Sequence, residues 1–339
     1  MSPSMDVFNS DAFSVQSLTA AINETPFVPG RLGQLGIFEE QGITTTAISI
    51  ERQGETLALV PVTPRGGVPT PHSPGKRSMR LLETVRLALT DAVYADEVQN
   101  VRAFGSEEAV ETVVATVNRR NEQMGRKLDV TLEHHRIGAI KGVVYDSDGT
   151  QEIHNLFTIF GVTQYAEINF DLANVAPASG AVSKKCSEVI RKIEDELGGL
   201  PATGVQCMCG SAFFDDLIAH SEIRDTFQAQ NAAQLRERTA RRSLFYGGIT
   251  FEEYRGKVGS IQYIPDDKAH FFPLGVPGLF LTRFAPADYE ETVNTLGLPR
   301  YAKQAPDPDG MGRKRVLEVQ SNPINLCTRP KVLIKARRT

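Results

Sequence analysis

Adjacent histidines and closely spaced cysteines are the residues of this chain with the strongest potential for metal chemistry. His134 directly precedes His135, and Cys207 and Cys209 are separated by one residue. Neighbouring helical residues point about 100° apart, so the two histidines cannot both face one metal ion. Structural zinc sites use paired ligands two to four residues apart together with a second pair. We therefore predict no metal site, and we expect all four cysteines to be small buried thiols in a reducing compartment (186, 207, 209 and 327).

Three further motifs begin like known sites without completing them. Asp146-Ser147-Asp148-Gly149 lacks the later ligands and flanking helices of an EF-hand, and Asp-Gly between alternating strands is typical of a hairpin turn. Gly210-Ser211 does not complete GxSxG. Gly75-Lys76 lacks the first glycine of a phosphate-binding loop, because Thr70 occupies that position. We predict no catalytic residue, no cofactor and no enzyme activity.

Composition indicates an ordinary folded protein. The 339 residues are 41% hydrophobic and 23% charged, which allows two or three domains. No apolar run is long enough to span a membrane, and Met1–Ser10 lacks the features of a secretory signal, so we expect a cytoplasmic protein without membrane contact.

The charge is distributed unevenly along the chain. Residues 313–339 hold eight Lys or Arg and one acid, a net charge of +7 that leaves −11 for the rest of a chain of net charge −4. A basic tail of this kind could contact polyanions, although a solvated or salt-bridged surface is the commoner explanation. No nucleic-acid-binding motif accompanies the charge.

The element that organises the chain is a long helix predicted over Ser106–Ile140. Gly105-Ser106 supplies an N-cap, and about 35 residues would span about 50 Å, more than the width of a small domain. Such a spine suits a tile or scaffold better than a compact enzyme. One face is apolar (Ala109, Val110, Val113, Val114, Val117, Met124, Leu128 and Leu132). The other face, expected to be solvated or to meet a polar partner, is polar (Glu111, Asn118, Arg119, Asn121, Glu122, Arg126 and Asp129).

Before this helix, the sequence predicts an arm and a projecting loop. Residues 1–42 have little periodicity and predict an extended arm with one short helix near Val15–Ile22. Two strands, 44–50 and 56–62, are expected to pair across Gln53-Gly54, and strand-like alternation resumes over 79–89. A long segment rich in proline and glycine lies between them. This composition favours a semi-rigid loop that extends to another surface. The predicted inter-subunit contacts lie in this loop (Pro64, Arg65, Gly66, Gly67, His72, Lys76 and Arg77).

After the helix, the sequence predicts a hairpin and a second body. Segments 142–146 and 150–160 should pair across the Asp-Gly turn. The second body contains helices over 181–197, 211–220 and 221–242, a strand over 205–209, and a strand with a tight turn over 245–249. The last strands are expected over 262–264, 270–274, 279–284, 315–320 and 332–335. We expect the spine, the hairpin and these last strands to build one sheet around the inserted second body.

Several blocks in a fixed order resemble one known family. They are Leu57–Pro61 with Pro64–Gly67, Val101–Gly105, Gly278–Phe280 with Phe284–Tyr289, Gly297–Lys303, and Gln320–Pro323 with Cys327–Pro330. These blocks are similar to those of the major capsid proteins of lambda-type tailed bacteriophages, the phage major capsid protein E family.

The resemblance implies an α+β fold, the tailed-bacteriophage major capsid fold or Johnson fold, which herpesvirus capsid floors share. It implies an N-terminal arm (1–42), an extended loop (43–90), a peripheral domain with the spine helix 106–140 (91–171 and 260–339), and an axial domain (172–259).

The function implied is that of a structural virion protein. It would self-assemble into pentamers and hexamers of an icosahedral head shell enclosing double-stranded DNA, with assembly in the host cytoplasm. The implied partners are copies of itself, a separate scaffolding protein, a portal, a decoration protein and non-specifically bound DNA. A tail-tube-like or encapsulin-like assembly protein is the alternative, and a hydrolase is a weaker one.

Overall fold

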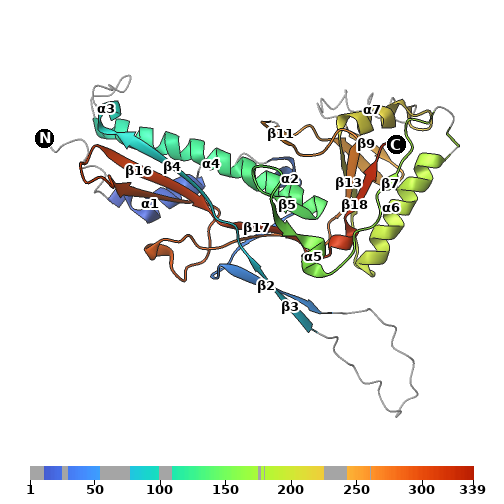
Figure 1. The fold of residues 1–339 in the computed structure, drawn as a ribbon, viewed down its shortest axis with the longest axis horizontal. Coiled ribbons are helices and arrows are strands. Elements are labelled where there is room, and N and C mark those ends of the chain that lie inside the picture. Colours follow the sequence, from blue (N-terminus) through green and yellow to red (C-terminus); the bar gives the residue numbers. More distant parts are fainter. Residues whose placement is uncertain are drawn as a thin grey trace, which may run out of the picture. The chain divides into compact units, whose positions relative to one another are not determined.

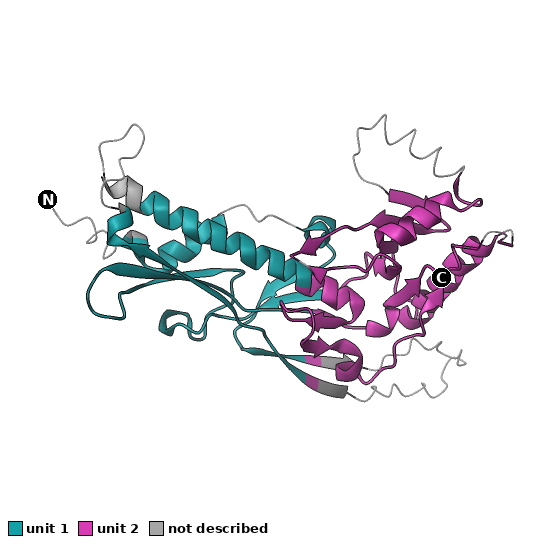
Figure 2. Ribbon diagram, turned by 45° about the horizontal axis from the view of Figure 1, so that its top comes forward, with its two compact units in different colours: residues 1–49, 81–134, 281–325 teal, residues 50–80, 135–280, 326–339 magenta. Residues whose placement is uncertain are grey.

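The chain forms two compact units that are each assembled from segments distant in sequence. The computed structural model describes residues 11–24, 30–53, 77–98, 109–174, 177–178, 180–224, 243–259 and 261–339. Unit 1 comprises Met1–Ser49, Leu81–His134 and Leu281–Asn325, and unit 2 comprises Ile50–Arg80, His135–Phe280 and Leu326–Thr339 (Figure 2).

Unit 1 contains two three-stranded sheets and the greater part of the long helix. One sheet has the order β15-β16-β4, and the other has the order β1-β14-β17. The strands are β1 (Glu39–Gly42), β4 (Leu87–Tyr94), β14 (Phe280–Phe284), β15 (Tyr301–Pro306), β16 (Lys314–Ser321) and β17 (Pro323–Cys327). The helices are η2 (Asp11–Phe13), α1 (Val15–Glu24), α2 (Arg31–Leu35), α3 (Ala95–Val98), α4 (Ala109–Lys141) and η3 (Glu290–Thr292) (Figure 1).

The predicted spine helix is confirmed as α4, which is described from Ala109. Its apolar stripe packs with α1 and with β4, β15 and β16 in one buried cluster (Phe13, Leu18, Ile22, Val93, Val117, Met124, Leu128, Ala302, Leu317 and Val319). Leu317 and Val319 alternate along β16, so both point to the helical side of the sheet. The predicted helix near Val15–Ile22 is also confirmed, and it packs on the sheet edge at β15.

The polar face of α4 is only partly solvated. Asn118 and Arg119 are exposed as expected, but Asn121 and Asp129 are buried. Asp129 meets a polar partner, because its carboxylate accepts hydrogen bonds from the guanidinium of Arg300 at 2.6–3.0 Å. Helical spacing predicted the polarity of this position but could not show which element covers it.

The arm contains more structure than the sequence indicated. Besides α1, it forms α2 and strand β1, and β1 lies parallel to β14 with Glu39 beside Leu281. Glu133 of α4 holds the start of α2, since its Oε1 accepts from the Leu32 amide at 2.8 Å. These elements depend on residues more than 100 positions away, so local periodicity did not reveal them.

Within the described residues, the strands that pair in the loop region are not the two that the sequence predicted. Strand β2 (Ala47–Gln53) pairs with β3 (Arg77–Glu83), and the expected partner strand 56–62 lies outside the described residues. The strand predicted over 79–89 is interrupted at 84–86, where the chain leaves β3 before β4 begins.

Unit 2 is built on a six-stranded sheet of order β7-β18-β13-β8-β10-β9. Its strands are β7 (Ile168–Asn169), β8 (Gly204–Cys209), β9 (Ser243–Tyr246), β10 (Ile249–Glu253), β13 (Lys268–Leu274) and β18 (Ile334–Arg337). The other elements are β5 (Val143–Tyr145), β6 (Glu152–Asn155), α5 (Leu156–Phe160), α6 (Ala181–Leu197), α7 (Ser211–Ala219), β11 (Lys257–Val258), β12 (Ile261–Gln262) and η4 (Pro330–Val332).

The core of unit 2 is aromatic. Phe170 stacks on Phe271 with ring centroids 5.6 Å apart, and it meets Phe213 edge-on at 5.5 Å. Helix α6 buries the predicted face, including Cys186 and Val189. Helices α6 and α7, strand β8 and the turn between β9 and β10 agree with the sequence prediction, while most of the helix expected over 221–242 lies outside the described residues.

The last strands do not build one sheet, and this corrects the prediction. Strand β16 pairs with β4 in unit 1, whereas β13 and β18 pair within the sheet of unit 2 beside β8. The strands that follow the second body are thus divided between the units, with 281–325 in unit 1 and 326–339 in unit 2.

The predicted hairpin is confirmed up to residue 155 and is wrong beyond it. β5 and β6 pair across the Asp-Gly turn, in which the carboxylate of Asp148 accepts hydrogen bonds from Thr150 and Gln151. These bonds lower the pKa of Asp148 to about 2. Residues 156–160 form helix α5 instead of a strand, because Asn155 caps it by accepting from the Thr158 amide.

The basic end of the chain is not a tail. Residues 314–321, 323–327 and 334–337 are strands of the two units. Several of its charges form ion pairs within the chain, including Lys331 with Glu196 and Arg338 with Asp216. Of the two explanations that the sequence left open, a salt-bridged surface is the arrangement found for these residues.

Candidate assembly surface

The most distinctive surface of unit 1 is the segment 288–299 between β14 and β15, which we call the 288–299 loop. Its backbone is held by its own polar groups: the Thr292 hydroxyl donates to the Ala287 carbonyl at 2.7 Å, and the Thr295 hydroxyl donates to the Thr292 carbonyl at 2.7 Å. The Tyr301 hydroxyl accepts from the Leu298 amide at 2.8 Å. The loop is therefore a defined shape without a regular helix or strand over most of its length.

Glycine allows the loop to pack directly on the sheet beneath it. The Gly297 amide donates to the Ile43 carbonyl at 2.9 Å. A Cβ at Gly297 would collide with the Phe284 carbonyl oxygen, and a Cβ at Gly42 would collide with the Gly297 carbonyl oxygen. Both positions require glycine because the contacts are with backbone atoms.

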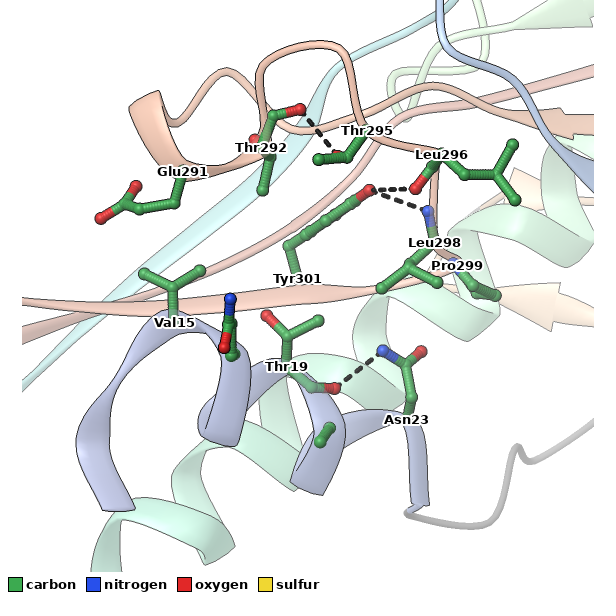
Figure 3. A pocket seen from close by; sticks show the side chains of 12 residues that line it. Val15, Thr19, Asn23, Glu291, Thr292, Thr295, Leu296, Leu298, Pro299 and Tyr301 are labelled. Carbon is green, nitrogen blue, oxygen red and sulfur yellow. Dashed lines mark hydrogen bonds between the residues drawn. The ribbon is translucent and has the colours of Figure 1, made fainter. Parts of the chain in front are cut away.

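A groove of about 570 Å³ separates this loop from α1. Figure 3 shows Tyr301 between the two walls, with its hydroxyl directed toward Leu296 and Leu298. Burial raises the pKa of Tyr301, so its hydroxyl keeps its proton at neutral pH. The α1 wall contributes both apolar and polar side chains, and the loop wall does the same (Val15, Gln16, Thr19, Ala20 and Asn23; Glu291, Thr292, Thr295, Leu296, Leu298 and Pro299).

Three large apolar side chains project from the loop into solvent. Val293 is 65% exposed, Leu296 61% and Leu298 41%. Between them, Asn294 has φ +58°, a left-handed conformation uncommon for a residue with a side chain. Exposed apolar groups on a constrained backbone are typical of a surface that a protein partner covers.

Charged side chains around the loop are mostly paired within unit 1. Lys303 contacts Glu291 at 2.8 Å, and Arg86 contacts Asp288 at 3.1 Å and Glu318 at 3.0 Å. The Tyr289 hydroxyl also donates to Glu318, and burial together with that carboxylate raises the pKa of Tyr289. These pairs hold the polar rim in place beside the apolar side chains.

The residues predicted to contact a neighbouring subunit cannot be placed in this surface. Pro64, Arg65, Gly66, Gly67, His72 and Lys76 lie outside the described residues, and Arg77 is the first residue of β3. The 288–299 loop was not predicted as a contact. The signal available in the sequence was a group of large apolar residues with neither helical nor strand period.

The cysteines first considered for metal chemistry all lie in the described part of the chain. All four cysteines are buried and free, and burial raises the pKa of Cys186 and of Cys327 to about 12. Such thiols are protonated and unreactive at neutral pH. The described residues contain no group of three or more metal-ligating side chains, and none of their helices is long and apolar enough to cross a membrane.

The fold is that of phage capsid proteins. The crystal structure of a prophage capsid protein from E. coli CFT073 superposes with a TM-score of 0.56, at 12% identity, over 96% of this chain and 99% of that one. This mixed α and β architecture is the tailed-phage capsid fold, or Johnson fold.

Sequence comparison then identifies the family. The profile of phage major capsid protein E matches residues 14–338. The major capsid protein of Pseudomonas phage KPP10 is 29% identical over 96% of this chain and 97% of its own length, and that of Salmonella phage Felix O1 is 25% identical over 96% of each chain. The chain belongs to the phage major capsid protein E family.

Proposed function

We propose that copies of this chain assemble as pentamers and hexamers into the icosahedral head shell that encloses the double-stranded DNA of a tailed phage. The observation that carries this proposal is the family match over nearly the whole chain, together with two major capsid proteins that align over almost their full length. The exposed apolar side chains of the 288–299 loop support it, because neighbouring exposed apolar groups are typical of a surface that a protein partner covers.

Assembly of the expressed chain is the direct test. Purified protein is incubated under conditions that promote shell growth and is examined by electron microscopy and sedimentation. Closed particles of megadalton mass are expected. Rods or small rings would favour the tail-tube-like alternative, and a monodisperse monomer at high concentration would refute the proposal.

We also propose that the segment before Arg77, predicted from the sequence to be a long loop, lies over a neighbouring subunit. The described base of this region is a two-stranded ribbon, β2 with β3, in which Leu81 is 70% exposed. A ribbon with an exposed apolar side chain is suited to pairing or packing with another chain. Individually modest contacts of this kind are multiplied in a closed shell.

Deleting residues 66–75 tests this contact. Loss of closed particles with retention of soluble folded protein is the expected result. The matched control is Asp148→Asn in the exposed β5–β6 turn, which should assemble as the unaltered chain does. Intact shells from the deletion variant would contradict the proposed role of the loop.

The remaining partners follow from the shell function. We propose a scaffolding protein, a portal and a decoration protein as partners, assembly in the host cytoplasm, and non-specific contact with packaged DNA. Arg313 and Arg337 are exposed bases of the C-terminal region that could meet DNA. Replacing both with glutamine should reduce the salt dependence of DNA binding, and an unchanged salt slope would reject their contact.

A further inference from the structure

A second surface of unit 1 complements the 288–299 loop in charge. Along α4, the residues Arg119, Gln123, Arg126, Lys127 and Val130 are exposed. Their spacing of three, four or one places them on one face of the helix over about 16 Å. We call this set the α4 stripe.

The two surfaces carry opposite charges. The 288–299 loop and the side chains paired with it hold four carboxylates and two bases, a net charge of −2 (Asp288, Glu290, Glu291 and Glu318; Arg86 and Lys303). The α4 stripe holds three bases, of which Arg126 pairs with Glu122, so its net charge is +2.

Each surface also offers exposed apolar side chains beside its charges. Val130 is 44% exposed at one end of the stripe, and the loop presents Leu296 and Leu298 next to its groove. The acidic 288–299 loop would repel DNA. The α4 stripe is a better partner for it, because the stripe has the opposite charge and an exposed apolar side chain at one end.

We propose that the 288–299 loop of one copy packs against the α4 stripe of a neighbouring copy. This inference rests on the proposed shell function and names the surfaces that meet in it. Because the two surfaces differ, the contact is head-to-tail, and each copy uses its loop toward one neighbour and its stripe toward the other. Such contacts close into rings or continue across a shell.

Cross-linking distinguishes this contact from other arrangements. Leu298→Cys and Val130→Cys introduce one exposed thiol on each surface, and the four native cysteines are buried. Assembled particles of the double variant are treated with a short bismaleimide and run on a denaturing gel. A ladder of covalent oligomers is expected, because a head-to-tail contact links each copy to two others. Each single variant provides the control and should give no ladder.

Charge exchange supplies an independent measurement. Glu290→Lys and Lys127→Glu should each raise the concentration needed for half-maximal assembly by roughly threefold to tenfold, and the double exchange should return it to within about twofold of the unaltered chain. Closed particles without a cross-linked ladder, or a double exchange that assembles no better than the worse single variant, would overturn the inference. An unaltered chain that forms no particles would instead refute the proposed function.

Discussion

Substitution of one partner in the buried ion pair between Asp129 and Arg300 should lower the unfolding free energy of unit 1 strongly. Their side chains are 3% and 7% exposed, and two guanidinium nitrogens of Arg300 reach the carboxylate at 2.6–3.0 Å. A third nitrogen donates to the Ile22 carbonyl at 3.1 Å, so the pair joins α4 to α1 and to the start of β15. Removing one partner leaves a charge that water cannot reach.

Asp129→Asn keeps the shape of the side chain and removes its charge. Breaking a buried pair costs about 3–5 kcal/mol, and the amide oxygen that replaces the carboxylate would still accept one hydrogen bond, so we expect about 3 kcal/mol of unfolding free energy to be lost. Chemical denaturation measures the loss. Hydrogen exchange should show it first in α1, since Arg300 holds the Ile22 carbonyl there.

An exposed pair in the same unit is the matched control. Glu291 and Lys303 are 47% and 30% exposed and 2.8 Å apart, so Glu291→Gln should cost less than about 1 kcal/mol. Replacing both buried partners with apolar residues, Asp129→Leu with Arg300→Met, should be less harmful than Asp129→Asn, because no buried charge remains. If Asp129→Asn costs no more than Glu291→Gln, the reasoning about burial is wrong.

Two other predictions concern pH and backbone packing. Burial, followed by the charges of neighbouring lysines, lowers the pKa of His270 from 6.5 to about 3. As pH falls, His270 is therefore protonated in the unfolded chain before it is protonated in the folded protein, and the unfolding free energy should decrease between pH 6.5 and about 3. The unfolding free energy of His270→Gln should decrease less steeply over this range. Equal slopes of unfolding free energy against pH for the two proteins would contradict this account. Gly297→Ala should lower the unfolding free energy by about 1–3 kcal/mol, because the added Cβ meets the Phe284 carbonyl. Gly204→Ala is the control, because its added Cβ has open space, and it should lower the unfolding free energy by less than about 1 kcal/mol. Equal losses of stability for the two variants in thermal unfolding would refute the steric argument.

The local sequence pattern was sufficient to predict those elements whose determining residues lie close together in the sequence. The apolar stripe of α4 and the buried face of α6 follow from side-chain spacing, and the Asp148-Gly149 turn follows from backbone chemistry. The family was also accessible, because blocks distributed over the whole chain resemble one set of proteins and the family match confirms them. These features depend on residue type and order alone.

The surfaces were decided by tertiary structure. Asp129 is polar in sequence, yet it is buried because Arg300, 171 residues away, comes to meet it. β13 and β16 were both predicted as strands of one sheet, yet they join different sheets because strand pairing depends on segments far away in the chain. The exposure of Leu296 likewise depends on how Gly297 packs against β14. Sequence specifies which side chains can be buried, but only the folded arrangement determines which apolar groups remain for a neighbouring copy to cover.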